Sequence, residues 1–475
     1  MVKEWKEETL DPEDWGKMKL LAKQMAEDMM VYQQTIRERP ILKQKTQKVL
    51  DYFNQPVPEK PLGPQKTYEE FLHNFIENKG SLVSHPCAWA AVAGQGTPFG
   101  ALADMWMSGM NGIVHNYDLA TELEMQVISW FKQILNYPRE ASGILVSGGS
   151  MANLIGLAVA RNSKASYDVN RDGANQKLTF YGSTELHSSV PRDLELLGIG
   201  SRNLRQIPVD KNYRINLSEL REKIEEDRSA GFRPVCVVGN AGSTNVGAID
   251  DLPALVDLSK EEDMWLHVDG AFGSWAALTT KYSHLVEGQE KADSLAFDLH
   301  KWMYMPYGIG CTLVKDEDAH YRTFQSNPDY LHHDIRVLSD YTFELSRPSR
   351  ALKAWMSIKE HGVEKYRRLI EKNIDQSHYV CKLVEESPKL ELLAPVQLNV
   401  VCFRYTKADL GDDDLDKLNM GIFQKLLEGG KFAVLPSRVA GRTVLRFCNT
   451  NHRTTYGDLD RFIDEVIKLG DVVSV

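Results

Sequence analysis

Two kinds of segment alternate through the centre of the chain. Between about residues 140 and 315, short apolar runs are separated by stretches with helical spacing of apolar residues; these runs read "GILVS", "LTFYGS", "VCVVGN", "WLHVDG", "SLAFD" and "GCTLV". Strands that are apolar throughout and separated by helices are typical of a mainly parallel sheet covered on both faces. The pattern therefore predicts a large α/β domain, which we place at residues 85–355.

The two flanking regions differ from this centre. Residues 1–84 contain two amphipathic helical stretches, "PEDWGKMKLLAKQMAEDMMVYQQTI" and "TYEEFLHNFIENKG", joined by a proline-rich connector. Amphipathic helices on a long arm need a surface to cover them, and a partner subunit is one candidate. Residues 356–475 continue a long helical zone, followed by three apolar strands and a last helix, which predicts a smaller C-terminal α/β domain.

Composition narrows the class of protein. The chain has 475 residues, 43% of them hydrophobic and 26% charged, and a formal net charge of −10. An acidic chain argues against nucleic acid or an anionic membrane as the main partner. We expect no spanning helix and no secretory signal, because no apolar run approaches the roughly 18 residues that a span requires. Six scattered cysteines without a CxxC spacing fit reduced thiols, so we expect a cytoplasmic protein.

The strand ends carry the candidate chemistry, because ligands of open α/β sheets bind beyond the carboxyl ends of the strands. After "GILVS" comes "GGSMAN", which includes Gly149 and Ser150. Backbone N–H groups and a hydroxyl at the start of a helix can bind phosphate, although the same residues are as often only a turn and a cap. The chain contains no Walker or GxGxxG pattern, which argues against nucleotides.

Three further strand ends supply ionisable side chains. His187 follows "LTFYGS", Asp269 ends "WLHVD", and Lys301 follows "SLAFD". An aspartate at the end of so apolar a strand is costly to bury without a cationic partner, which favours a role in a site. The alternative is that Asp269 only caps a turn. Pyridoxal phosphate uses a lysine, an acid for its ring nitrogen and donors for its phosphate, so it accounts for all of these groups. The apolar surroundings of Lys301 lead us to expect a neutral, nucleophilic amine.

These motifs also carry a family resemblance. "HVDGAF", "ADSLAFDLHKW" and "HSSV", together with "HPCAWA", "GGSMAN", "GSTNVGAID", "NPDYLHHD" and "SRPSRALKAW", occur in the order found in the group II pyridoxal phosphate-dependent amino acid decarboxylases. The resemblance covers nearly the whole chain. It implies a fold type I enzyme with pyridoxal 5'-phosphate as cofactor, an N-terminal arm that packs on the partner subunit, and a homodimer.

The resemblance assigns catalytic roles to four residues. Lys301 would form the Schiff base with the cofactor, Asp269 would pair with the ring nitrogen, and His187 would stack on the ring. Tyr330, in "NPDYLHHD", matches a mobile-loop tyrosine that protonates the substrate α-carbon after carbon dioxide leaves. A phenol on a closing loop can deliver a proton while excluding water.

Further cofactor contacts are implied in the same way. Gly149 and Ser150 would hold the phosphate, with His300 nearby, while Thr244 and Ala271 would line the ring.

Two charged residues need a separate interpretation. Asp298 stands where many relatives have asparagine near the phosphate, and a second anion there would repel the cofactor unless it points away or meets a cation. Arg347 matches a family arginine that we interpret as structural or near the phosphate.

The substrate pocket is the least constrained part. "HPCAWA" places Pro86, Cys87 and Ala88 where related aromatic decarboxylases carry bulkier residues, and Gly112 also stands where an aromatic is frequent. Smaller walls could admit a larger ring such as indole, or could mean a different substrate. His115 is a possible polar group of this pocket, with a structural histidine as the alternative.

The expected function is decarboxylation of an aromatic L-amino acid (tryptophan, tyrosine, phenylalanine or DOPA) to the amine and carbon dioxide. The alternatives are decarboxylation of another amino acid, such as glutamate, histidine or diaminobutyrate, and aromatic aldehyde synthesis. A catalytically inactive cofactor-binding protein is a third hypothesis. Relatives that make aldehydes replace the residue matching Tyr330 or His187, and both are intact here.

Overall fold

The computed structural model describes residues 8–114, 118–174, 177–325 and 336–473. The chain divides into two compact units, Met1–His85 and Pro86–Val475. Among the described residues, no helix is long and apolar enough to cross a membrane.

The first unit is helical, as its pattern predicts. It contains α1 (Trp15–Gln34), α2 (Gln47–Phe53) and α3 (Pro64–Phe71), the last followed by a π-helical turn. Asp14 caps α1 by accepting hydrogen bonds from Gly16 N and Lys17 N. Few of the unit's apolar side chains are buried, so its helices keep much of their apolar surface exposed.

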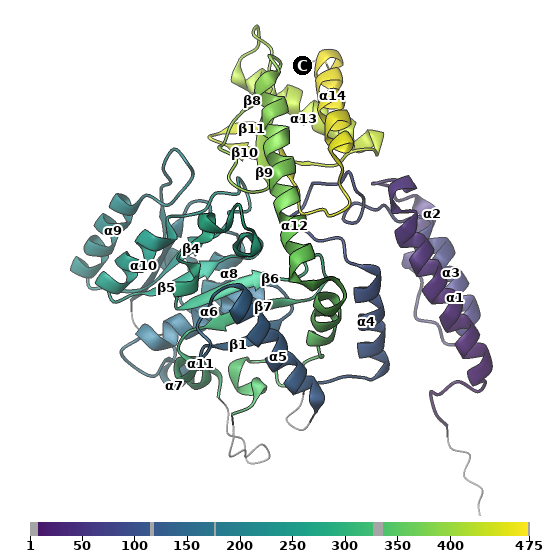
Figure 1. The fold of residues 1–475 in the computed structure, drawn as a ribbon, viewed down its shortest axis with the longest axis horizontal. Coiled ribbons are helices and arrows are strands. Elements are labelled where there is room, and N and C mark those ends of the chain that lie inside the picture. Colours follow the sequence, from purple (N-terminus) through teal and green to yellow (C-terminus); the bar gives the residue numbers. More distant parts are fainter. Residues whose placement is uncertain (1–7, 115–117, 175–176, 326–335, 474–475) are drawn as a thin grey trace, which may run out of the picture. The chain divides into compact units, whose positions relative to one another are not determined.

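The second unit is built on a seven-stranded sheet (Figure 1). Its order is β1-β7-β6-β5-β4-β2-β3, and only β7 runs antiparallel to its neighbours. The strands, in chain order, are β1 (Ser142–Val146), β2 (Leu178–Ser183), β3 (Leu204–Ile207), β4 (Arg233–Asn240), β5 (Trp265–Asp269), β6 (Ser294–Asp298) and β7 (Gly310–Val314). The predicted mainly parallel sheet is confirmed, and it has seven strands.

Helices cover both faces of this sheet. The helices before β7 are α4 (Pro98–Gly109), α5 (Leu119–Ile134), α6 (Gly149–Lys164), α7 (Val169–Asp172), α8 (Ser189–Leu196), α9 (Leu217–Ser229) and α10 (Leu252–Glu261); α11 (Glu317–Phe324) follows it. Helix α6 packs across β4, β5, β6 and β7 on one face, while α9 and α10 contact β4 or β5 on the other. Buried on both faces, these strands are apolar throughout.

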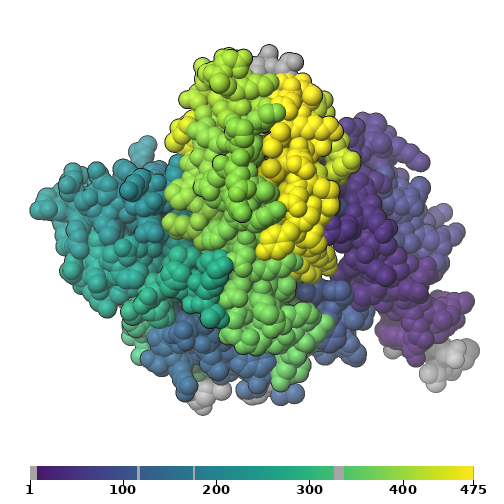
Figure 2. All heavy atoms as spheres, turned by 45° about the horizontal axis from the view of Figure 1, so that its top comes forward, coloured from purple at the N-terminus to yellow at the C-terminus, as the bar shows by residue number. Residues whose placement is uncertain are grey.

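The C-terminal part continues from α12 (Ala351–Glu386), which breaks at Gly362, where φ is +66°. A four-stranded antiparallel sheet follows, in the order β10-β11-β9-β8. Its strands are β8 (Leu390–Leu392), β9 (Val400–Tyr405), β10 (Leu435–Val439) and β11 (Arg442–Cys448), with helices α13 (Asp412–Gly429) and α14 (Tyr456–Val472). Figures 1 and 2 show α14 lying alongside α12. The predicted boundary at residue 355 falls within α12, and a separate C-terminal domain stays a prediction.

Candidate active site

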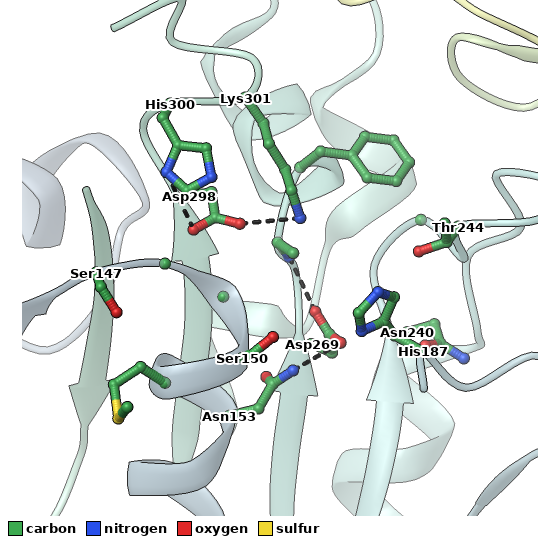
Figure 3. Close-up of a pocket in the computed structure, with 16 residues that line it drawn as sticks. Ser147, Ser150, Asn153, His187, Asn240, Thr244, Asp269, Asp298, His300 and Lys301 are labelled. Atoms are coloured by element: carbon green, nitrogen blue, oxygen red, sulfur yellow. Dashed lines mark hydrogen bonds and ion pairs between the residues drawn. The ribbon is translucent and has the colours of Figure 1, made fainter. Parts of the chain in front are cut away.

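A cavity of about 390 Å³ lies where β4, β5 and β6 end and α6 begins (Figure 3). Eight residues selected from the sequence line it, namely Gly149, Ser150, His187, Thr244, Asp269, Ala271, His300 and Lys301. The carboxyl ends of parallel strands meet at one edge of a sheet, which explains why segments distant in sequence converge here.

The turn between β1 and α6 forms one wall of the cavity. A Cβ atom added at Gly148 would lie 2.9 Å from His300 Cε1, and one added at Gly149 would lie 2.8 Å from Asp298 Oδ2. Only glycine therefore fits at this close approach of the turn to the end of β6. The backbone N–H groups that begin the 16-residue helix α6, with the Ser150 hydroxyl beside them, are suited to an anion such as phosphate.

Lys301 enters the cavity just beyond β6. Its Nζ lies 2.9 Å from Asp298 Oδ2, and about 20% of the side chain is exposed. Burial lowers the pKa of Lys301, but Asp298, with smaller contributions from Asp269 and Tyr307, raises it above that of an ordinary lysine. The expectation of a neutral amine is therefore wrong, because the apolar stretch contains a carboxylate that meets the ammonium group.

Asp269 ends the neighbouring strand β5. Its Oδ2 accepts a hydrogen bond from Asn153 Nδ2 at 2.9 Å, and its Oδ1 accepts one from Ala271 N at 3.1 Å. Both donors are neutral, so the carboxylate remains able to attract a cationic group inside the cavity.

Two histidines lie on different sides of the cavity. Burial lowers the pKa of His187 although Asp269 opposes the effect, and a neutral ring is suited to stacking. His187 Nδ1 accepts a hydrogen bond from Ser189 N at 3.2 Å. His300 lies against Tyr307, with ring centroids 4.7 Å apart, and its Nδ1 is 2.9 Å from Ile309 O.

Comparison with known proteins decides the family. The model of the pyridoxal-dependent decarboxylase conserved domain matches residues 70–406. The chain belongs to this family. It is a pyridoxal phosphate-dependent amino acid decarboxylase, as the resemblance implied.

Individual relatives extend over most of this decarboxylase. An aromatic-L-amino-acid decarboxylase of Bacillus atrophaeus is 34% identical over 429 residues, 88% of each chain. A phenylacetaldehyde synthase of Petunia hybrida is 27% identical over 76% of each chain. A crystal structure of Oryza sativa TDC with PLP and tryptamine covers 98% of this chain and 99% of its own, with a TM-score of 0.90 and 23% identity.

The donor set of the decarboxylase fits its cofactor. The glycine turn at the start of α6 offers room and N–H groups for a phosphate, and Lys301 offers an amine. Asp269 offers a carboxylate to which no charged donor is bound within the described part of the chain. These residue roles stay predictions.

The structure places the predicted substrate residues elsewhere. Pro86, Cys87 and Ala88 are buried against the C-terminal part: Thr454 Oγ1 donates to Pro86 O, and Ala433 N donates to Cys87 O. They are not among the residues lining the cavity with Lys301, and their role in substrate binding stays a prediction. His115 and Tyr330 lie outside the described residues.

Arg347 lies away from the cavity lining. Its Nη1 donates to Glu124 Oε1 and to Leu145 O, both at 3.0 Å, and the side chains of Arg347 and Glu124 are buried. Of the two interpretations offered by the sequence, a structural arginine agrees with these contacts.

Several lining residues, among them Asn153 and Asn240, were not predicted from the sequence, and Asp298 was considered there but not assigned to the site. Asn240 and Asp298 end strands β4 and β6, and Asn153 lies in the first turns of α6. Their position at strand ends and at a helix start was the available signal. Asp298 meets the ammonium group of Lys301. An anion beside the phosphate was expected either to point away or to meet a cation, and the second condition holds.

Proposed function

We propose that this decarboxylase acts on an aromatic L-amino acid (tryptophan, tyrosine, phenylalanine or DOPA) and releases the amine and carbon dioxide. The observation that carries the mechanism is the convergence of Lys301, Asp269 and the Gly149–Ser150 helix start on one cavity. The aromatic substrate is supported by the name of the 34% identical Bacillus atrophaeus relative.

Each of three side chains in the cavity has its own role in the proposed reaction. Pyridoxal phosphate, when bound, supplies a ring that accepts the electron pair left as carbon dioxide departs. Lys301 would hold the cofactor through its amine, which must first give up a proton. Asp269 would hold a proton at the ring nitrogen, and the neutral ring of His187 would lie against the face of the cofactor.

The remaining roles concern binding and protonation. Gly149 and Ser150, with His300 nearby, would bind the phosphate, while Thr244 and Ala271 would border the ring. Tyr330 donates a proton to the substrate α-carbon and keeps water away from it.

A panel of the twenty amino acids tests the proposal. With pyridoxal phosphate added, an aromatic amino acid should give an amine, identified by mass, and one equivalent of carbon dioxide. Borohydride should fix the cofactor to Lys301. Turnover of glutamate, histidine or diaminobutyrate alone would overturn the aromatic assignment, and no turnover with a labelled Lys301 would indicate an inactive cofactor-binding protein.

Aromatic aldehyde synthesis is a second candidate, because a phenylacetaldehyde synthase is 27% identical to this chain. That reaction consumes molecular oxygen and water, and it releases ammonia and hydrogen peroxide besides carbon dioxide. The retention of His187 and Tyr330 favours amine formation instead. Tyr330→Phe should keep the cofactor but divert product toward aldehyde and peroxide, whereas an unchanged amine yield in this variant would remove Tyr330 from the mechanism.

We also propose that the protein is a homodimer in which the unit Met1–His85 packs on a second copy. Within this unit, Phe53, Phe71 and Phe75 form an exposed aromatic cluster, with Phe71 and Phe75 stacked at 5.4 Å. A patch of this kind favours burial in an interface.

Sedimentation analysis tests the dimer. Replacing the three phenylalanines by serine, or deleting residues 1–60, should shift the protein toward monomer, whereas Leu196→Ser, at an exposed position of α8, should not. A truncated protein that stays dimeric would refute the role of the arm.

A cytoplasmic location is our remaining proposal. All six cysteines are free, and five of them are buried, which fits a reducing compartment. Cell fractionation tests the location, and recovery of the protein outside the cytoplasm would overturn it.

A further inference from the structure

Behind Asp269, buried polar side chains form a continuous row of hydrogen bonds. Trp265 Nε1 lies 2.8 Å from Ser294 Oγ, which lies 2.8 Å from His267 Nδ1. His267 Nε2 lies 3.0 Å from Asn153 Oδ1, and Asn153 Nδ2 lies 2.9 Å from Asp269 Oδ2. The row joins β5, β6 and α6, and all five side chains are buried.

The row has only one consistent direction. The indole N–H of Trp265 can only donate, and the carboxylate of Asp269 can only accept. Asn153 must therefore present its NH2 group to Asp269 and its carbonyl to His267, so that His267 Nε2 carries the proton. His267 Nδ1 then accepts from the Ser294 hydroxyl, whose oxygen accepts from Trp265. Burial lowers the pKa of His267 to about 4, in agreement with a neutral ring.

The imidazole is also held in place by packing. A Cβ atom added at Gly156, one turn beyond Asn153 on α6, would lie 2.5 Å from His267 Cε1 and 2.6 Å from its Nδ1. Helix α6 therefore rests directly on the imidazole ring. Because Asn153 and Gly156 belong to one helix, the approach that fixes the ring also sets the position of the Asn153 amide.

We propose that His267 is a positioning residue that keeps the Asn153 amide turned toward Asp269, so that the Asp269 carboxylate stays aimed at the ring nitrogen of the cofactor. Hydrogen bonds to a carboxylate favour its charged form, and those in a buried network strengthen one another. This inference rests on the proposed pairing of Asp269 with that nitrogen.

Other titratable groups also face Asp269. They are His187 and Asp193 from the β2–α8 region and Lys301 from the segment after β6. The substitutions below leave all three in place, so a change in the pH response of the bound cofactor reports on the row behind Asp269.

The decisive variant is His267→Phe, which keeps a ring in the site but removes both hydrogen bonds. A proton on the ring nitrogen repels a second proton on the same conjugated system. When the ring nitrogen is less firmly protonated, this repulsion weakens and the second proton binds more readily. The pH midpoint of the cofactor absorbance should therefore rise by about one unit, part of the way toward the value for Asp269→Asn. The dissociation constant for pyridoxal phosphate should rise about tenfold. His267→Gln, which can donate from a similar position, should restore both values.

Tyr181→Phe is the matched control. Tyr181 is buried on β2 and donates to Asp227 Oδ2 at 2.7 Å, outside the row. It should lower the melting temperature without moving the absorbance midpoint. If His267→Phe behaves in the same way, with a lower melting temperature and an unchanged midpoint, His267 is only structural and the proposal is overturned.

A measurement on the unaltered protein guards against a variant that does not fold. Neutron crystallography of the full chain should show one proton on His267, at Nε2. A proton on Nδ1, or on both nitrogens at neutral pH, would overturn the proposal. Failure of the proposed function would look different, because borohydride would then leave Lys301 unlabelled whatever the state of His267.

Discussion

Strands β5 and β6 lie side by side, and each ends in an aspartate that lines the same cavity. Asp269 is held by two neutral donors, Asn153 Nδ2 and Ala271 N. Asp298 is paired with the Lys301 ammonium group, while its other oxygen is buried and accepts no hydrogen bond within the described residues. The same residue type in two similar strands therefore serves two purposes, because its partners differ. The charge of Asp269 remains available to a ligand, whereas the charge of Asp298 is paired with Lys301.

Removing Lys301 takes away the partner on the β6 side and should have the largest effect. Lys301→Ala should abolish the cofactor absorbance and lower decarboxylation by at least about a thousandfold, because Lys301 is the only lysine among the described residues that line the cavity. Absorbance spectra, borohydride labelling and carbon dioxide release measure these effects. Colour that persists unchanged would show that another residue holds the cofactor.

Neutralising each aspartate in turn tests the contrast directly. Asp269→Asn should lower kcat by about 100- to 1000-fold, the range found when a group that stabilises developing charge is removed. Asp298→Asn should stay within about tenfold of the unaltered enzyme, because its charge acts on Lys301 and not on the ring. Both are measured as carbon dioxide release at saturating cofactor. Equal losses in the two variants would contradict the contrast.

The pH dependence of cofactor attachment examines the β6 side alone. Asp298 raises the pKa of Lys301, and only the unprotonated amine attacks the aldehyde, so attachment should accelerate as pH rises. Asp298→Asn should move this profile to lower pH by about one unit, which is about tenfold in rate at neutral pH. Stopped-flow absorbance measures the rate. The control is Asp263→Asn, which removes an exposed partner of Lys164 and should leave the profile unchanged.

A third acid, Asp193 on α8, should show the smallest effect. Burial and then Asp269 raise the pKa of Asp193 from 3.8 to about 8. Between these values the folded protein keeps a proton that the unfolded chain gives up, so this residue makes the fold less stable as pH rises. Asp193→Asn should therefore raise the melting temperature by about 2–4 °C at pH 8 and have little effect at pH 4. Thermal melts measure this, with exposed Asp257→Asn as the control, and an equal gain at both pH values would contradict it.

The predicted helices and strands agree with the structure where the local pattern of residues has only one interpretation. Six apolar runs between residues 140 and 315 correspond to six of the seven strands of the large sheet, and the shorter, less apolar β3 was not among them. Strand β8 and helix α13 were not predicted either. The break of α12 at Gly362 was also missed, because a glycine within a long amphipathic pattern does not by itself show that it adopts a positive φ.

The site divides in a similar way. Lys301, Asp269 and Gly149 could be selected from the sequence because they end apolar strands or begin a helix, and parallel strands deliver such ends to one edge. The raised pKa of Lys301 could not be predicted from the sequence. It depends on how the chain turns after β6 and on whether Asp298 faces the amine or points away.

By itself, the sequence determined the kinds of elements, the parallel sheet and the chemical groups that its edge presents, because each follows from local periodicity and residue type. Only the tertiary structure decided which groups touch. Trp265, His267 and Ser294 read as parts of two apolar strands, and Asn153 as part of a helix start. They form one row of hydrogen bonds because β5 and β6 are adjacent and α6 crosses above them with a glycine over the imidazole. That adjacency is a property of chain packing, and no local stretch of residues encodes it.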